Sequence, residues 1–197
     1  MVDVGKINMK RLMISVHPEW VEKILNGEKT VEVRPWIPKG ELPLEVLIYV
    51  TKGEQLERHW KKVLPLSEQF ILYGQKVKKD RLSSPHCLNG KVVAKFTLNK
   101  AEEIIMRKIC GEWEVYGSEN GQDSLIQKSC LTQKEIFRYL KGNNGYAWHI
   151  DDLKIFERPK ELSEFKTVVH YPKNIVQIYL DYKPLKKAPQ KMVWVEK

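Results

Sequence analysis

Hydrophobic and polar positions along the chain predict a series of short strands joined by a few helices. A continuous apolar run is typical of a strand buried on both faces, and alternation is typical of a strand with one exposed face. Residues 44–51 are of the first kind and are expected at the centre of a sheet. Residues 90–98 are of the second kind, with Lys91 and Lys95 facing outward. The predicted strands cover residues 11–16, 30–34, 44–51, 90–98, about 112–116, 146–156 and 192–196.

Local signals mark two helices and a bulge. The first helix begins at Pro18 and ends at Gly27, because glycine adopts the left-handed conformation without a Cβ clash. The second helix follows a capping box, in which the side chains of Thr132 and Glu135 complete the first turn. Residues 117–123 are polar and are expected to form a surface loop. The apolar phase shifts at Asp151-Asp152, which predicts a β-bulge within the strand there.

A short strand after the first helix carries charge on one face. Val31 and Val33 point to one side, while Glu32 and Arg34 point to the other and Lys29 lies at the preceding turn. We expect the valines to be buried and the charged face to be open. Such a face is either a solvent-exposed ladder of ion pairs, worth about 0–1 kcal/mol, or a small polar site built on rigid backbone.

The length and pattern of the chain favour one domain over residues 1–197. Residues 52–89 are charge-rich and weakly periodic, and we interpret them as an insertion or an elaborated connection. An amphipathic helix over residues 56–64 is one interpretation of part of it, and a cationic cluster follows at residues 76–81. Nothing in this segment predicts a second independent core.

Composition indicates which partners, cofactors and cellular compartment to expect. The chain has 34 Lys and Arg against 25 Asp and Glu, a formal net charge of +9, which favours a polyanionic partner such as nucleic acid. Its three cysteines are far apart without a Cys-x-x-Cys pair, so we expect no metal, no cofactor and a reduced compartment. The sequence shows neither the apolar core of a signal peptide nor the ~18 apolar residues of a membrane span. We therefore expect a cytoplasmic protein without membrane contact.

The charged segment also carries a motif. Gly27, Lys29, Glu32 and Arg34 match the run Gly-x-Lys-x-x-Glu-x-Arg, after a strand and a helix in the expected order. In this the chain resembles the ASCH family of the PUA-like superfamily, of the bacterial or phage type. The runs at residues 148–150 and 188–190 extend the resemblance toward the C-terminal end. It implies an α+β fold: a small mixed, mainly antiparallel β-barrel of PUA-like type with flanking helices and an inserted charged segment.

The resemblance implies a ligand groove lined by the charged strand. Lys29 and Arg34 are expected to bind phosphate, and Glu32 to accept a hydrogen bond from the exocyclic amine of a base or to hold Arg34 in place. Trp148 is either a core residue or a stacking platform for an unpaired base, and His17 either caps the first helix or enters the groove. The remaining candidate ligand-binding residues are Ser15, Trp36, His149, Lys186 and Lys187.

Three functions are open at this stage. The leading hypothesis is a module that binds RNA or a modified nucleoside and is not an enzyme. The alternative is a hydrolase, a nucleoside amidohydrolase or a ribonuclease, that uses Lys29, Glu32 and His17 in the same groove. Some ASCH relatives remove an acyl group with a Lys and a Thr of the motif; here Glu32 stands at the Thr position, which disfavours that mechanism. The third is a regulatory module with a protein partner.

Overall fold

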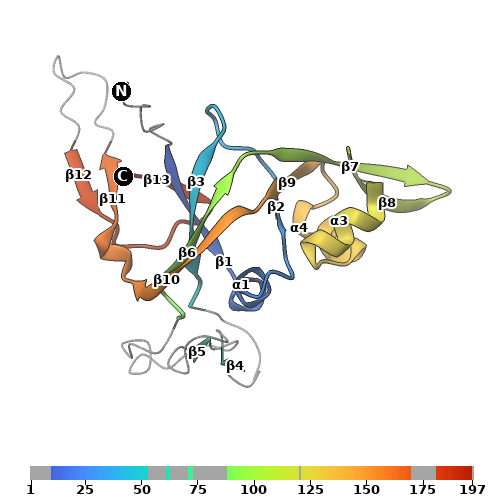
Figure 1. Ribbon diagram of the computed structural model, residues 1–197. Helices are drawn as coiled ribbons and strands as arrows, with labels where there is room; N and C mark the ends of the chain where they lie inside the picture. Colours follow the sequence, from blue (N-terminus) through green and yellow to red (C-terminus); the bar gives the residue numbers. More distant parts are fainter. Residues whose placement is uncertain are drawn as a thin grey trace, which may run out of the picture.

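The computed structural model describes residues 10–52, 61–62, 71–72, 88–119, 121–169 and 181–196 and has an α+β fold made mostly of strands (Figure 1). The helices are α1 (Pro18–Leu25), α3 (Gly121–Ser129), α4 (Gln133–Leu140) and the short 3-10 helix η1 (Leu162–Glu164). The strands are β1 (Arg11–Val16), β2 (Val31–Arg34), β3 (Leu44–Val50), β4 (Lys61–Lys62), β5 (Ile71–Leu72), β6 (Val92–Leu98), β7 (Ala101–Ile109), β8 (Glu112–Gly117), β9 (Gly145–His149), β10 (Asp151–Lys160), β11 (Lys166–Val169), β12 (Asp181–Pro184) and β13 (Met192–Val195).

The first sheet has five strands in the order β10-β6-β3-β1-β13. β3 is central and buried on both faces, as its continuous apolar run predicts. It pairs in parallel with β1, with Leu12 opposite Val46, and antiparallel with β6, with Val46 opposite Phe96. A parallel pair needs a crossover connection. Here α1 and β2 lie in that connection, so the crossover carries the charged segment out of the first sheet and into the second.

The second sheet has the order β2-β9-β7-β8, with Glu32 of β2 opposite Trp148 of β9. The chain passes from this sheet to the first between His149 and Asp151. Asp152 there has a φ of 48°, and the register of β10 against β6 shifts just after Asp151. The predicted bulge is thus confirmed, and it is the point at which the chain changes sheets. Among the described strands, the pairing gives these two open sheets, the two-stranded pairs β11-β12 and β4-β5, and no closed ring.

Three apolar clusters hold the sheets in place, and two of them include residues of the second sheet. The larger one joins the first sheet to α1 and to Trp148 of the second. The smaller one lies between the second sheet and the helices α3 and α4, with Val31 and Val33 packed beside Ile136 and Leu140. Because successive side chains of a strand point to opposite faces, the valines of β2 face these helices and Glu32 and Arg34 face the other way.

The structure confirms most of the predicted elements and corrects others. The strands at both ends, the central strand, α1, and α4 with its capping box are found where the pattern places them. The loop predicted over residues 117–123 is wrong in its second half, since α3 begins at Gly121. Lys91, predicted to face outward, is only 5% exposed and lies 3.5 Å from a carboxylate oxygen of Glu161. β7, β11 and β12 were not among the predicted strands.

The predicted insertion lies largely outside the described residues. The cationic cluster at residues 76–81 falls there entirely, and so does most of the helix suggested over residues 56–64. Within that helix, Lys61–Lys62 is a strand that pairs with Ile71–Leu72.

Candidate functional site

A pocket of about 1130 Å³ lies where β1, β2, β3, α1 and α4 meet the segment before β13. Five Lys and Arg residues and three Glu residues line it, which leaves two net positive charges. The lining residues are Ser15, Val16, His17, Trp20, Lys29, Glu32, Val33, Arg34, Tyr49, Thr51, Lys52, Gly90, Leu131, Glu135, Tyr139, Glu161, Leu162, Ser163, Leu185, Lys186, Lys187, Ala188, Pro189 and Gln190.

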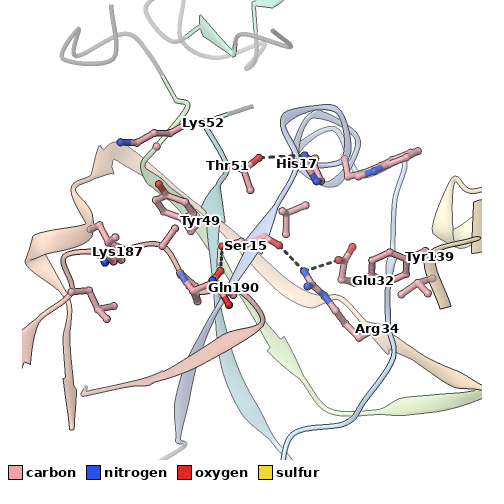
Figure 2. A pocket seen from close by; sticks show the side chains of 18 of the residues that line it. Ser15, His17, Glu32, Arg34, Tyr49, Thr51, Lys52, Tyr139, Lys187 and Gln190 are labelled. Carbon is pink, nitrogen blue, oxygen red and sulfur yellow. Dashed lines mark hydrogen bonds and ion pairs between the residues drawn. The ribbon is translucent and has the colours of Figure 1, made fainter. Parts of the chain in front are cut away.

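The charged residues of the motif form a buried cluster in the wall of this pocket. Glu32 lies between two cations: its carboxylate is 2.9 Å from Arg34 Nη2 and 3.4 Å from Lys29 Nζ. Arg34 Nη2 also donates to the carbonyl of Ser15 at 2.9 Å, and Lys29 Nζ donates to the carbonyl of Ser129 at 2.8 Å. Figure 2 shows Glu32, Arg34 and Ser15 in this arrangement. The cluster therefore ties β2 to β1 and to the end of α3.

The exposure of the cluster overturns one prediction. Lys29 is 2% exposed, and Glu32 and Arg34 are each 6% exposed, so the charged face is not open and the ion pairs are not a solvent-exposed ladder. Within the cluster, Arg34 Nε is buried and has no hydrogen-bond partner. Buried N–H groups are almost always hydrogen-bonded. This nitrogen is therefore the unsatisfied donor of an otherwise paired cluster.

Burial changes the acid–base character of Lys29. Removal from water lowers the pKa of its ammonium below the usual 10.5, and the neighbouring Glu32 only partly offsets this. The ammonium also lies 5.6 Å from the centre of the Trp20 ring, a cation–π distance.

The other end of the pocket is built differently. Tyr49, Lys52 and Lys187 lie together on the opposite side of the pocket from Glu32, Arg34 and Tyr139 (Figure 2). Tyr49 is 3% exposed, and burial, together with the charge of Glu161, raises the pKa of its phenol. Lys52 and Lys187 are exposed and have no acidic partner among the described residues. This end therefore offers exposed cations that no acid of the described residues compensates.

Seven of the predicted site residues come together in the pocket. The pocket lining contains the three charged residues of the motif together with Ser15, His17, Lys186 and Lys187. The geometry of His17 favours one of its two predicted roles, entry into the groove, over capping of the first helix. Its side chain makes no capping bond to α1, and its Nδ1 lies 3.4 Å from Thr51 Oγ1 at the pocket.

The remaining three predicted residues do not line this pocket. Trp148 is fully buried in the larger core cluster, where its Nε1 donates to the carbonyl of Trp36 at 3.2 Å. The two indole rings meet edge to face with centroids 5.2 Å apart. His149 Nε2 lies 3.6 Å from a carboxylate oxygen of Glu102. The structure thus places the tryptophans in packing and gives them no position from which to stack on a ligand in this pocket.

Many lining residues were missed by the sequence analysis, and three of them are aromatic. Trp20 was assigned to the apolar face of α1, and Tyr49 to a strand buried on both faces. Tyr139 is 47% exposed and lies off the stripe of Ile136 and Leu140 on α4. An exposed aromatic residue on the polar side of an amphipathic helix is the one signal that could have drawn attention to it.

Other classes of site find no support among the described residues. No group of three or more His, Cys, Asp and Glu side chains there could hold a metal ion. Cys110 and Cys130 are free thiols, and Cys87 lies outside the described residues. No helix in the described ranges has the length and apolar character needed to cross a membrane.

Comparison with known proteins places part of this α+β chain in a known family. The ASCH domain model matches residues 14–98, which include the whole Gly-x-Lys-x-x-Glu-x-Arg run, so this part of the chain belongs to the ASCH family. The crystal structure of ASCH from Zymomonas mobilis aligns at a TM-score of 0.50 and 18% identity, covering 95% of this chain and 89% of that one.

A second solved structure gives the same result. A tyrosine-to-phenylalanine mutant of the Zymomonas mobilis protein aligns at a TM-score of 0.50 and 17% identity, over 96% of this chain and 92% of that one. At these identities the likeness concerns the fold alone. No curated protein matches the chain in sequence.

Proposed function

We propose that the pocket binds RNA or a modified nucleoside and holds an unpaired base against the cluster of Lys29, Glu32 and Arg34. The observation that carries the proposal is the buried cluster itself, with one donor, Arg34 Nε, left unsatisfied in the wall of a pocket. This nitrogen is buried in the wall, and a ligand carbonyl that reached it would give it a hydrogen-bond partner. A buried donor that gains a partner removes a desolvation cost of about 1–3 kcal/mol.

The chemistry of the cluster suits the edge of a base. An ionised carboxylate has about four lone-pair sites, and the two cations occupy only part of the capacity of Glu32. The remainder can accept a hydrogen bond from an exocyclic amine, as Glu and Asp accept from cytosine. The rings of Trp20 and Tyr139 line the same end of the pocket and can stack on the base. The net charge of +9 supports an anionic partner.

The proposal extends to the architecture. In a PUA-like barrel, the two curled sheets would belong to one closed β structure with the pocket at its side. This interpretation is supported by the ASCH match and by the direct passage of the chain from β9 into β10.

The sharpest test replaces Tyr139 by alanine, because its ring is half exposed and lines the pocket without filling the core. Wild type and variant are titrated with a single-stranded RNA pool and with a panel of modified ribonucleosides. Loss of one stacked base is worth about 1–3 kcal/mol, so binding should weaken on the order of tenfold or more. Tyr182→Ala, an exposed tyrosine of β12 outside the pocket lining, is the matched control. Absence of wild-type affinity for every probe, or equal affinity in both variants, would contradict the proposal.

A hydrolase in the same pocket is the second candidate, and the lowered pKa of Lys29 favours it. An amine that loses its proton more easily can serve as a base or a nucleophile. Against this role, its nitrogen is occupied by the Ser129 carbonyl and by Glu32. The same titrations, followed by chromatography of the ligands, decide between the two. Product that wild type forms and Lys29→Met does not would make the protein an enzyme. Weak binding without preference among nucleic acids would favour a protein partner.

A further inference from the structure

We infer that the ligand of this pocket carries a ribose phosphate, and that the phosphate binds at Tyr49, Lys52 and Lys187 and not at the charged motif. The inference rests on the proposed function, since it names the class of ligand that the same pocket would take. It reverses the assignment that the sequence suggests, in which Lys29 and Arg34 bind phosphate.

Two donors of the motif, Lys29 Nζ and Arg34 Nη2, are already in use. Lys29 Nζ has the Ser129 carbonyl at 2.8 Å and Glu32 at 3.4 Å, and Arg34 Nη2 has the Ser15 carbonyl and Glu32, each at 2.9 Å. A phosphate there would compete with a carboxylate that is already held between the two cations. The cluster is therefore suited to the neutral, hydrogen-bonding edge of a base.

The opposite end has the reverse character. Lys52 and Lys187 line this end without an acidic partner among the described residues, and Lys186 is also part of the lining. Glu161 also lines the pocket, and its carboxylate lies 3.5 Å from Lys91 Nζ. Because burial raises the pKa of Tyr49, its phenol stays protonated and can donate a hydrogen bond to an anion. Lysine ammonium groups and a phenol O–H are ordinary donors to phosphate oxygens.

The backbone around this end is fixed. The side-chain amide of Asn89 approaches the carbonyls of Thr51 and Lys52, both at 3.4 Å. Gly90 has a φ of +82° and lies against the side chains of Lys52 and Tyr49. A Cβ at this position would lie 3.4 Å from Lys52 Cε and 3.9 Å from the Tyr49 oxygen. The phenol oxygen and the stem of Lys52 therefore converge on one point of the pocket wall.

The segment that carries Lys186 and Lys187 is fixed at both sides. Leu185 is buried, and its N–H donates to the carbonyl of Phe165 at 2.8 Å. On the other side, Ser15 Oγ donates to the carbonyl of Pro189 at 2.7 Å. Two lysines held on an anchored segment lose less freedom on binding than lysines of an unattached tail. Since the cavity of about 1130 Å³ is large for a small ligand, a base and a phosphate can occupy the two ends together.

The test compares ligands that differ only in phosphate. Wild type is titrated at low salt with the four ribonucleosides, with their 5′- and 3′-monophosphates, with dinucleotides and with inorganic phosphate. We expect one position of the phosphate to raise affinity on the order of tenfold over the matching nucleoside. The monophosphates test recognition of a terminal phosphate, and the dinucleotides test recognition of the phosphodiester. An RNA strand supplies an internal phosphodiester, whereas a free nucleotide supplies only a terminal phosphate.

The double variant Lys52→Gln/Lys187→Gln should lose this increment and keep the wild-type affinity for the nucleoside within about twofold. Lys108→Gln, on the exposed end of the β7–β8 hairpin outside the pocket lining, is the charge-matched control and should keep both. Equal binding of nucleoside and monophosphates by wild type, or an increment that survives in the double variant, would overturn the inference. Binding of inorganic phosphate that the double variant loses, with no affinity for any nucleoside, would uphold the phosphate site while the proposed base recognition fails. If no probe binds, both fail.

Discussion

The two ends of the pocket carry the same kinds of side chain in opposite states. At one end, Lys29, Glu32 and Arg34 are nearly excluded from water and neutralise one another in part. At the other, Lys52 and Lys187 are exposed and have no acidic partner among the described residues. The difference shows that a count of charges does not locate an anion site. Cations that are bound to carboxylate and carbonyl groups maintain the structure, whereas cations that lack partners are available to a ligand.

The comparison also separates stability from binding. Loss of one partner from a buried ion pair leaves an uncompensated charge in a poorly solvated place, which is strongly destabilising. Loss of an exposed lysine changes stability little but changes the potential that an anionic ligand meets. The predictions below test this separation, beginning with the largest expected effect.

Glu32→Gln should reduce the free energy of unfolding by about 3–5 kcal/mol, because it leaves Lys29 and Arg34 buried without their shared carboxylate. Denaturant titration at neutral pH measures the change. Glu112→Gln, on the exposed β7–β8 hairpin, is the matched control and should change stability by less than about 0.5 kcal/mol. A loss below about 1 kcal/mol for Glu32→Gln would show that the cluster is not the structural element described here.

The affinity for single-stranded RNA should depend on salt mainly through the exposed lysines. If Lys52, Lys186 and Lys187 each neutralise one phosphate, binding should fall about 20-fold between 50 and 200 mM salt. In Lys52→Gln/Lys187→Gln the same change of salt should cost only about threefold. Fluorescence anisotropy at several salt concentrations gives both slopes. Identical slopes in the two proteins would place the phosphate contacts elsewhere.

Ser15→Ala tests the hydrogen bond that links the two ends. The hydroxyl of Ser15 holds the Pro189 carbonyl, and the carbonyl of Ser15 holds Arg34. Loss of the hydroxyl bond should cost about 0.5–1.5 kcal/mol of stability. It should also weaken binding of phosphorylated ligands more than binding of nucleosides, since it frees the segment with Lys186 and Lys187. If binding of both ligand types weakens equally, that segment is not held by Ser15.

Replacement of Glu135 should change the free energy of unfolding least among these variants, although Glu135 lines the same pocket as Glu32. Hydrogen bonds from the backbone and the hydroxyl of Thr132 lower its pKa below 4.5, and removal from water opposes them weakly. The folded state therefore favours the ionised form. Its contribution is present above pH 4.5 and is lost as the pH falls through the lowered pKa.

Glu135→Gln keeps the residue type of a capping box and removes a charge at a helix N-terminus, which is worth about 0.3–1 kcal/mol. Thermal unfolding of both proteins from neutral pH into this acidic range measures the difference, which should shrink as the pH falls. A difference that stays constant over that range would exclude the ionised carboxylate as its source.

Local patterns in the sequence determined the local structure. The continuous apolar run of β3, the capping box of Thr132 and Glu135, the helix end at Gly27 and the phase shift at Asp151 each specify backbone conformation within a few residues. The motif likewise identified the residues of the charged cluster. These features could be predicted because the interactions that produce them, such as capping bonds and side-chain alternation, act over one or two turns or along one strand.

The tertiary structure alone decided which charges are free. Alternation places Glu32 and Arg34 on one face of β2, but it cannot show that this face packs toward β1, where Arg34 reaches the carbonyl of Ser15. The carbonyl that binds Lys29 belongs to Ser129, one hundred positions away, at the end of a helix that begins within a segment predicted as a loop. Exposure and ion pairing depend on which surfaces meet, and those surfaces come from segments far apart in the chain. The sequence therefore named five of the eight charged residues of the pocket, Lys52 not among them, and packing divided its cations into structural and available ones.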